Sequence, residues 1–176
     1  MYRLSQEHAM PEASRSDDLD AMRQLAHSPG DSSSLRELRA EGKKTARERI
    51  SNLLDKGSFV EVDSFVQHRA GDHNMHLHRP MGDGVVAGHG MIDGRRVVCF
   101  AQDYAVFSGT MGEMHAKKIA KIAEFAEKSQ LPLIGIWAGA APRGEEGVAY
   151  ILFTNFSSFL KLKLKKIYLY INHKTF

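Results

Sequence analysis

The sequence predicts an α/β domain in which helices pack against a sheet. Two apolar runs joined by Asp93-Gly94 predict a hairpin within residues 83–103, because this dipeptide favours the tight turns that connect antiparallel strands. A helical pattern follows the hairpin, an apolar run over residues 131–137 predicts another strand, and a further helix is expected from about Glu145. This order of strand, strand, helix, strand and helix defines the fold class.

The N-terminal part divides into a lead-in and the start of the domain. Residues 1–33 are polar and end in a Ser-, Pro- and Gly-rich stretch, which predicts a flexible lead-in. Thr45 and Glu48 have the spacing of a capping box, so a helix is predicted to begin there and to stop at Gly57. Its buried face is expected to comprise Ala46, Ile50, Leu53 and Leu54.

Two segments separate this helix from the hairpin. Residues 58–66 alternate between apolar and polar side chains, as a half-buried strand does. Residues 67–83 show no period and predict a long loop, which in a compact domain is functional or mobile. The histidines in and near this loop match no zinc site, so a solvent-exposed loop is favoured over metal binding. They are His68, His73, His76, His78 and His89.

Two glycine-rich turns flank the helix that follows the hairpin. The first lies within residues 107–112, and the helix behind it has one apolar stripe that includes His115 and Ile119. The second is GIWAGAAPRGEEG, residues 135–147, where an apolar strand opens into a turn with almost no side chains. Such a turn can bind a ligand through main-chain N–H groups, or it can be a tight connection without a ligand.

Charge and composition exclude several classes of function. The chain has 24 basic and 21 acidic residues, but no acidic residue follows Glu146, so the basic balance belongs to the tail. We therefore expect no nucleic-acid-binding surface on the domain. Cys99 lies in an apolar run and is predicted to be buried. Because it is the single cysteine of the chain, an internal disulfide is excluded. The sequence contains no run of 18 consecutive apolar residues, so it predicts no membrane-spanning helix.

Both ends of the chain differ from its middle. The N-terminal segment is too acidic for a typical transit peptide, so we expect a cytoplasmic protein, with the mitochondrial matrix as the alternative. Residues 149–176 form an atypical tail rich in lysine and aromatic residues, in which LKLKLKKIYLYI alternates with period two. This tail is expected to be a lysine-edged strand, an aggregation-prone segment, or the product of a shifted or unspliced reading frame.

Three separated motifs resemble one family. The motifs are GKKTARERISNLLDKGSFVEVD, GDGVVAGHGMIDGRRVVCFAQDYAVFSGTMGEMHAKKIAKI and the placement of RGEEGV. They occur in the order and spacing of a carboxyltransferase subunit. This is the subunit of biotin-dependent acyl-CoA carboxylases of the propionyl-CoA carboxylase β-chain type. The resemblance runs from about Gly42 to Val148. The family has two crotonase-like halves built of repeated ββα units, so the chain is expected to be a truncated protein with the first half only, as a partial domain over residues 34–148.

The resemblance implies transfer of a carboxyl group from carboxybiotin to the α-carbon of a short acyl-CoA. Main-chain N–H groups would stabilise the enolate oxygen, and the matching donors here are those of Ala140 and Ala141, after Gly139. The family has paired glycines at the two alanine positions. Pro142 follows and has no N–H, so the turn loses a donor that this position would otherwise supply.

The resemblance also implies a binding site for coenzyme A in this half. Gly109 and Gly112 would let the chain pass close to the acyl group, with simple helix entry as an equal alternative. Arg47, Lys117 and Lys118 could bind the phosphates of CoA, although a solvated helix face explains them as well.

Two functions follow from the resemblance. The first is the acyl-CoA-binding part of a carboxyltransferase, with decarboxylation as the possible reverse direction. The second is a non-catalytic truncated paralogue or an interaction fragment with the same fold. The implied partners are acyl-CoA and a biotin carboxylase or biotin carrier subunit. Because the carrier holds the biotin, no cofactor is expected to bind this chain directly. Homo-oligomers are typical of the family but doubtful for a chain that has only the first of the two halves. No membrane partner is expected.

Overall fold

The structure is a computed structural model that describes residues 12–139, 142–146 and 167–170. Its strands form a sheet in the order β1-β2-β3-β4-β5, in which the first three are antiparallel and β3, β4 and β5 run parallel. The strands are β1 (Val60–Val62), β2 (Val85–Ile92), β3 (Arg95–Gln102), β4 (Leu133–Ile136) and β5 (Ile167–Tyr170). The α-helices are α1 (Glu12–His27), α2 (Ser32–Ala40), α3 (Ala46–Leu53) and α4 (Glu113–Lys128).

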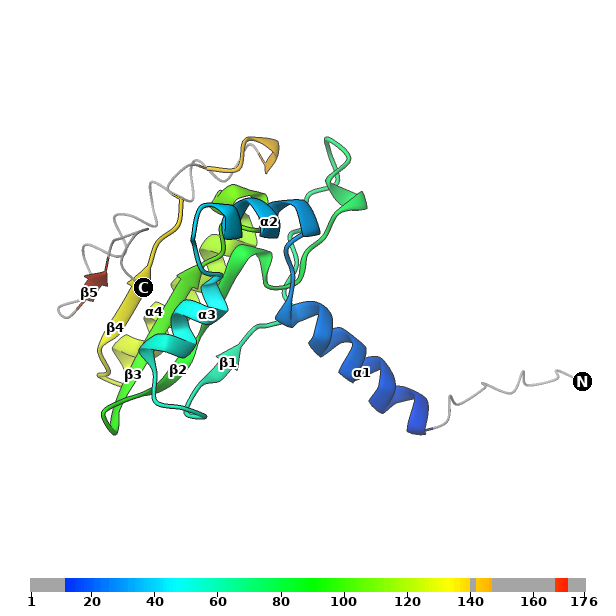
Figure 1. Cartoon of the computed structure of the whole chain (residues 1–176). Coiled ribbons are helices and arrows are strands. Elements are labelled where there is room, and N and C mark those ends of the chain that lie inside the picture. The colour runs from blue at the N-terminus through cyan, green and yellow to red at the C-terminus, as the bar shows by residue number, and fades with distance from the viewer. Residues whose placement is uncertain (1–11, 140–141, 147–166, 171–176) are drawn as a thin grey trace, which may run out of the picture.

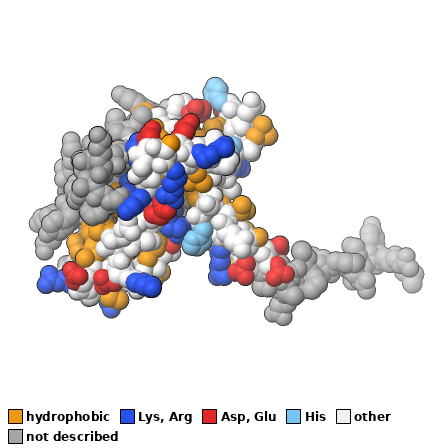
Figure 2. Space-filling view, in the orientation of Figure 1, with side chains coloured by type: hydrophobic (Ala, Val, Ile, Leu, Met, Phe, Trp, Pro, Cys, Tyr) orange, Lys and Arg blue, Asp and Glu red, His pale blue; other side chains and the backbone are white. Residues whose placement is uncertain are grey.

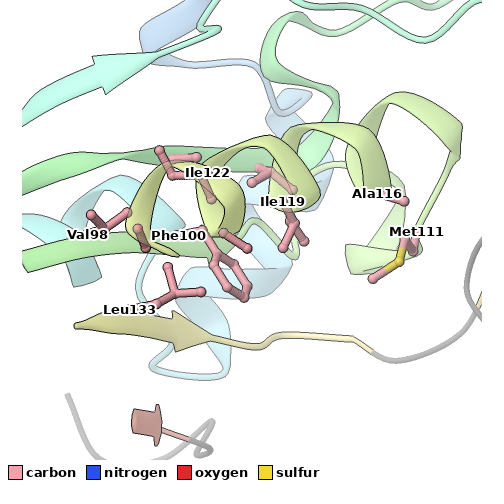
Figure 3. Close-up of a cluster of buried hydrophobic side chains, with 11 residues drawn as sticks. Val98, Phe100, Met111, Ala116, Ile119, Ile122 and Leu133 are labelled. Atoms are coloured by element: carbon pink, nitrogen blue, oxygen red, sulfur yellow. The ribbon is translucent and has the colours of Figure 1, made fainter. Parts of the chain in front are cut away.

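Helices cover both faces of the sheet, α3 on one side and α4 on the other (Figure 1). The period-two alternation of β3 explains this arrangement, because Val98 and Phe100 pack towards α4 while Cys99 and Ala101 pack towards α3. Figure 3 shows the cluster on the α4 side, where Ile119 and Ile122 meet the strands. A sheet with two buried faces therefore supports the predicted α/β class.

The predicted hairpin is confirmed. β2 pairs with β3 in a register that places Ile92 opposite Arg95, with Asp93 and Gly94 at the turn. Both turn residues have positive φ, 49° and 72°, as a two-residue hairpin turn requires. Asp55 holds this turn, since its carboxylate accepts the N–H groups of Asp93 at 3.0 Å and Gly94 at 2.9 Å.

The predicted capping box is also confirmed. The Thr45 hydroxyl accepts the N–H of Glu48, and the Glu48 carboxylate accepts the N–H of Thr45. α3 ends at Leu53, four residues before Gly57, so this glycine belongs to the next turn and not to the helix end. The predicted strand over residues 58–66 is shorter than expected, because only Val60–Val62 pairs with β2.

The expectation of a flexible lead-in over residues 1–33 is wrong where the structure describes it. Residues 12–27 form α1, which projects from the domain and is largely exposed (Figure 1). The serine-rich stretch begins α2, because Asp31 accepts the N–H groups of Ser33 and Ser34 as an N-cap. Serine and aspartate favour helix starts as well as linkers, which is why the composition was misleading.

Several smaller predictions have clear outcomes. Cys99 is buried, and burial raises the pKa of its thiol to about 12, so it is an inert core residue. In the tail, Ile167–Tyr170 forms β5, which pairs in parallel with β4, and the three interpretations of the tail stay predictions. Where a helix is expected from Glu145, the structure shows a 3₁₀ turn at Gly144–Glu146, and the positions after Glu146 lie outside the described residues. Within the part of the chain that is described, no helix is long and apolar enough to cross a membrane.

Candidate functional site

The two glycine-rich turns of the sequence meet at one end of the sheet. One follows β3 and leads into α4, and the other follows β4. A Cβ added to Gly139 would lie 2.6 Å from the carbonyl oxygen of Gly109, and one added to Gly109 would lie 3.2 Å from the nitrogen of Gly139. The absence of side chains therefore lets two main-chain segments touch, which neither turn reveals on its own.

The segments stay together beyond this contact. Met111 and Pro142 form a parallel bridge, in which the N–H of Arg143 donates to the carbonyl of Met111 at 2.9 Å. Pro142 needs no N–H in this bridge, so the proline is compatible with the pairing. Ala140 and Ala141 lie outside the described residues, and their role as enolate donors stays a prediction.

Gly112 has a second, different reason to be glycine. It is the N-cap of α4, and a Cβ there would lie 2.4 Å from a carboxylate oxygen of Glu146. That carboxylate accepts the N–H of Glu113 at 2.7 Å and so satisfies the first turn of the helix. The geometry gives Gly112 a helix-entry role, while a contact of Gly109 or Gly112 with an acyl group stays a prediction.

A buried arginine ties the second turn to the rest of the site. The side chain of Arg143 is 1% exposed and pairs with Asp83 at 2.7 Å and with Glu146 at 2.6 Å. Its guanidinium also donates to the carbonyl of Thr110 and lies 4.2 Å from the ring centre of Phe107. One side chain thus connects the loop before β2, the turn after β3 and the turn after β4.

The partner of Arg143 is a strained and fully buried aspartate. Asp83 has a φ of 46° and no exposed surface. Burial raises the pKa of its carboxyl group, and the charge of Arg143 opposes that rise. The second carboxylate oxygen accepts the main-chain N–H of His115 at 2.8 Å. Sequence reasoning missed this pair, although both residues stand in the motifs that carry the family resemblance.

His115 was expected only as one residue of the apolar stripe of α4. It is buried as predicted, but its ring makes two polar contacts, with the carbonyl of Asp83 at 3.0 Å and with the side chain of Gln102 at 3.1 Å. Burial, assisted by the nearby charge of Arg143, lowers the pKa of His115 to about 3. The imidazole is therefore neutral at physiological pH. The other residues of the predicted stripe, Ile119, Ile122 and Ala126, are buried.

The three cations predicted to bind CoA phosphates lie in three different environments. Arg47 pairs with Glu61 at 2.7 Å and also donates to the carbonyl of Ala26. Lys117 is exposed and pairs with Glu113. Their binding to phosphate stays a prediction.

Lys118 does not lie on a solvated helix face. It is 3% exposed, and its ammonium group donates to the carbonyl of Val85. Burial lowers its pKa to about 8. The helical pattern alone could not reveal this, because the acceptors of its ammonium group are main-chain carbonyls outside α4, those of Gly82 and Val85.

In the loop over residues 67–83, here called the histidine loop, His73, His76 and His78 are exposed as expected. Five residues of this loop are buried, namely His68, Met75, Pro80, Gly82 and Asp83. His68 is 1% exposed and its Nε2 contacts the carbonyl of His78 at 2.8 Å, so the expectation of an exposed side chain is wrong there. His89 lies on β2 and stacks on Phe125. Among the described residues, no group of three or more His, Cys, Asp or Glu side chains is arranged to hold a metal ion.

An open cavity of about 370 Å³ lies beside the two turns, between the histidine loop and the start of α4. Most of its lining residues carry charged or polar side chains, and Arg69 pairs with Glu113 across it. Acidic and basic side chains are also interspersed over α2 and α3 on the face that Figure 2 shows. Neither region is a continuous basic surface of the kind that binds nucleic acid.

The β2–β3 hairpin, α4 and β4 define an α/β domain whose main-chain turns gather at the carboxyl ends of two parallel strands. The chain belongs to the carboxyl transferase domain family, whose model matches residues 37–153. It is 52% identical over 110 residues to the propionyl-CoA carboxylase beta chain of Saccharopolyspora erythraea, covering 62% of this chain and 20% of that protein. The identity is 47% over 131 residues to the beta5 subunit of a biotin-dependent acetyl-/propionyl-coenzyme A carboxylase from Mycobacterium tuberculosis, covering 74% and 24%.

Solved structures confirm the crotonase-like fold that the resemblance implied. The crystal structure of transcarboxylase 12S, with methylmalonyl-coenzyme A and methylmalonic acid bound, matches with a TM-score of 0.83 and 32% identity. The match covers 89% of this chain and 31% of that one. The chain spans about a fifth to a quarter of the length of the curated relatives it matches, which are covered to 20% and 24%.

Proposed function

We propose that this chain provides the acyl-CoA-binding part of a biotin-dependent carboxyltransferase. The reaction would move a carboxyl group from carboxybiotin, held by a partner carrier subunit, to the α-carbon of a short acyl-CoA. Family membership supports the reaction class. Transcarboxylase 12S, which has the same fold, is described as a hexamer in a multienzyme core with methylmalonyl-coenzyme A bound, which supports both an acyl-CoA ligand and a larger assembly.

The observation that carries this proposal is the contact between Gly109 and Gly139 at the carboxyl ends of β3 and β4. Ligands of α/β sheets bind outside the carboxyl ends of strands, where main-chain N–H groups and helix N-termini are available. Here α4 begins beside both turns, and its dipole favours negative charge at this end. Such a place suits an acyl group whose carbonyl oxygen becomes negatively charged.

In this proposal the main-chain N–H groups of Ala140 and Ala141 donate to the thioester oxygen. Loss of the α-proton to a base would move its electron pair into the thioester as an enolate, and the α-carbon would then attack the carboxyl carbon as the carbon–nitrogen bond to biotin breaks. The biotin nitrogen would keep the electron pair of that bond and take up a proton, so the acyl-CoA would exchange a proton for the carboxyl group and biotin would do the reverse. The N–H groups of Ala138 and Gly139 already donate to Gln102, so they do not serve the substrate. Removal of one such donor typically lowers the rate about 10²- to 10³-fold.

Among the predicted phosphate-binding cations, Lys117 has the environment that fits this role best. It is exposed on α4, and its partner Glu113 is also at the surface. Arg47 would have to leave its partly buried ion pair, and Lys118 its buried hydrogen bond to Val85, before either could reach a phosphate. We therefore place Lys117 first and keep the other two as weaker candidates.

Calorimetric titration of the full chain with propionyl-CoA and acetyl-CoA tests the proposal. We expect heat of binding with both acyl-CoAs, and free CoA serves as the control for contacts of the nucleotide alone. Circular dichroism establishes that the sample is folded. A folded chain that gives no heat with either acyl-CoA would contradict the proposal.

A second candidate is a member of the family that keeps the fold without the chemistry. Pro142 favours it, because the family pattern has a residue with an N–H at that position. Exchange of the α-protons of propionyl-CoA in deuterated water, followed by NMR, separates the two candidates without biotin. Binding with accelerated exchange supports the enzyme part, whereas binding without it supports the non-catalytic member.

A further inference from the structure

Gln102 is the last residue of β3 and has no exposed surface. Its side-chain oxygen accepts two consecutive main-chain N–H groups, from Ala138 at 2.9 Å and from Gly139 at 3.0 Å. We propose that Gln102 is a positioning residue, which fixes the start of the turn after β4 against Gly109 and so sets the shape of the acyl-CoA site. The link to acyl-CoA rests on the proposed function, whereas the link to the turn does not.

The orientation of the Gln102 amide follows from its neighbours. A main-chain carbonyl only accepts, so the contact between His115 Nδ1 and the carbonyl of Asp83 requires the proton on Nδ1. The neutral ring then has a bare Nε2, which must accept from the amide nitrogen of Gln102. The amide oxygen is thereby turned towards the two N–H groups of the turn.

The main chain of Gln102 is held as well. Arg49 on α3 donates through its guanidinium to the Gln102 carbonyl, from the face of the sheet opposite α4. Both the main chain and the side chain of this residue are thus anchored by groups from separate elements. A fixed amide can hold a turn in one place, which a freely rotating side chain cannot do.

The space around the turn leaves little tolerance for movement. Ala138 is buried, and Gly139 touches the carbonyl side of Gly109 so closely that even a Cβ does not fit. Without the Gln102 oxygen, the two N–H groups would have to find other acceptors, and the chain would have to shift to reach them. Displacements of about 1 Å at a binding site reduce function by up to about 10²-fold.

Two substitutions of Gln102 separate positioning from simple space filling. Gln102→Leu keeps a similar volume but removes the acceptor. Gln102→Glu restores an acceptor for the turn, and one proton between its second oxygen and Nε2 of His115 keeps that contact, whether the carboxyl group or the ring carries it. Gln24→Leu, on the exposed part of α1, is the matched control because it makes the same chemical change away from the site.

The first measurement is NMR of the full chain without ligand. We expect the Ala138 and Gly139 amide signals to move and their hydrogen exchange to accelerate at least about tenfold in Gln102→Leu. In Gln102→Glu, both amides should remain protected, because a carboxyl oxygen replaces the amide oxygen as their acceptor. The groups facing His115 in this experiment are Asp83, Arg143 and Lys118. Unchanged amides in Gln102→Leu would overturn the inference, whether or not acyl-CoA binds.

The second measurement is the affinity for propionyl-CoA. If the wild-type chain binds it, Gln102→Leu should bind on the order of tenfold more weakly, and Gln102→Glu should recover most of the affinity. Equal affinity of Gln102→Leu and wild type would overturn the role at the site. No binding by wild type would contradict the proposed function alone, because the amide signals still test the positioning of the turn. Should Gln102→Glu fail to fold, the amide and affinity data of Gln102→Leu decide the outcome.

Discussion

The two ends of the β2–β3 hairpin use the same hydrogen-bond arrangement in opposite environments. At one end the Asp55 carboxylate accepts two consecutive N–H groups from the exposed turn at Asp93 and Gly94. At the other end the buried Gln102 amide accepts two consecutive N–H groups at the start of the turn after β4, from the buried Ala138 and the partly buried Gly139. Water can replace the first acceptor but not the second. Burial, more than geometry, therefore decides how much such an acceptor contributes to the stability of the fold.

The buried end also contains buried ion pairs, whereas the ionised group at the exposed end, the Asp55 carboxylate, accepts main-chain N–H groups. We expect Arg143→Leu to lower the free energy of unfolding by about 3–5 kcal/mol, because Asp83 and Glu146 would remain buried without their counter-charge. Urea denaturation of the full chain measures this. Arg23→Leu is the control, since its pair with Asp20 is exposed and is worth at most about 1 kcal/mol.

A double variant tests whether charge is the cause. Adding Asp83→Asn to Arg143→Leu removes one unpaired buried charge, and asparagine tolerates the positive φ of this position. The double variant should therefore be more stable than Arg143→Leu alone. If it is less stable, lost packing and not lost charge explains the effect of Arg143.

The direct comparison of the two ends is Gln102→Leu against Asp55→Leu. We expect Gln102→Leu to cost about 1–3 kcal/mol for each buried N–H left unpaired. Asp55→Leu should cost about 1 kcal/mol, comparable to the loss of an exposed capping side chain, because water satisfies the freed groups. Thermal and urea unfolding measure both variants. Equal costs would mean that the buried turn finds other acceptors.

Close contact at the buried end makes the substitution of Gly139 costly. Gly139→Ala should cost about 1–3 kcal/mol, because its Cβ would lie 2.6 Å from the carbonyl oxygen of Gly109 and one of the two turns must move. Gly144→Ala is the matched control in the same turn, since no atom lies within 4 Å of its added Cβ. A similar stability for both variants would show that the glycine contact is not tight.

The buried end should also respond to pH through His115. Its folded pKa of about 3 lies below the ordinary value of 6.5, so the unfolded chain binds a proton that the folded chain excludes. This contribution to stability is complete above pH 6.5 and is lost as pH falls towards 3, by at most about 1.4 kcal/mol per pH unit. The charged groups facing His115 are Arg143, Lys118 and Asp83.

Comparison of wild type with His115→Asn isolates this contribution from the other titrating groups. The free energy of unfolding, measured from pH 7 to pH 5, should fall more steeply with acid in the wild type than in the variant. Parallel curves would mean that His115 is protonated at no cost in the folded state.

Much of the fold could be predicted because its signals are local. The Asp93-Gly94 turn, the capping box of Thr45 and the apolar stripe of α4 each depend on residues within a few positions of one another. The failures were local ambiguities: the serines after Asp31 fit a linker as well as a helix start, and they form a helix start. The family resemblance, carried by three motifs, was confirmed by a domain match over residues 37–153.

The sequence by itself therefore determined the β2–β3 hairpin, β4, α3, α4 and the family, because hydrophobic periodicity and turn chemistry act over short distances. Only the tertiary structure decided the surroundings of the site. Asp83 and Arg143 are 60 residues apart in the chain, and Gln102 meets Ala138 across 36 residues. Whether a charged or polar side chain is solvated, paired or buried depends on which distant segment covers it. For Lys118, Gln102 and Arg143, packing supplied that answer.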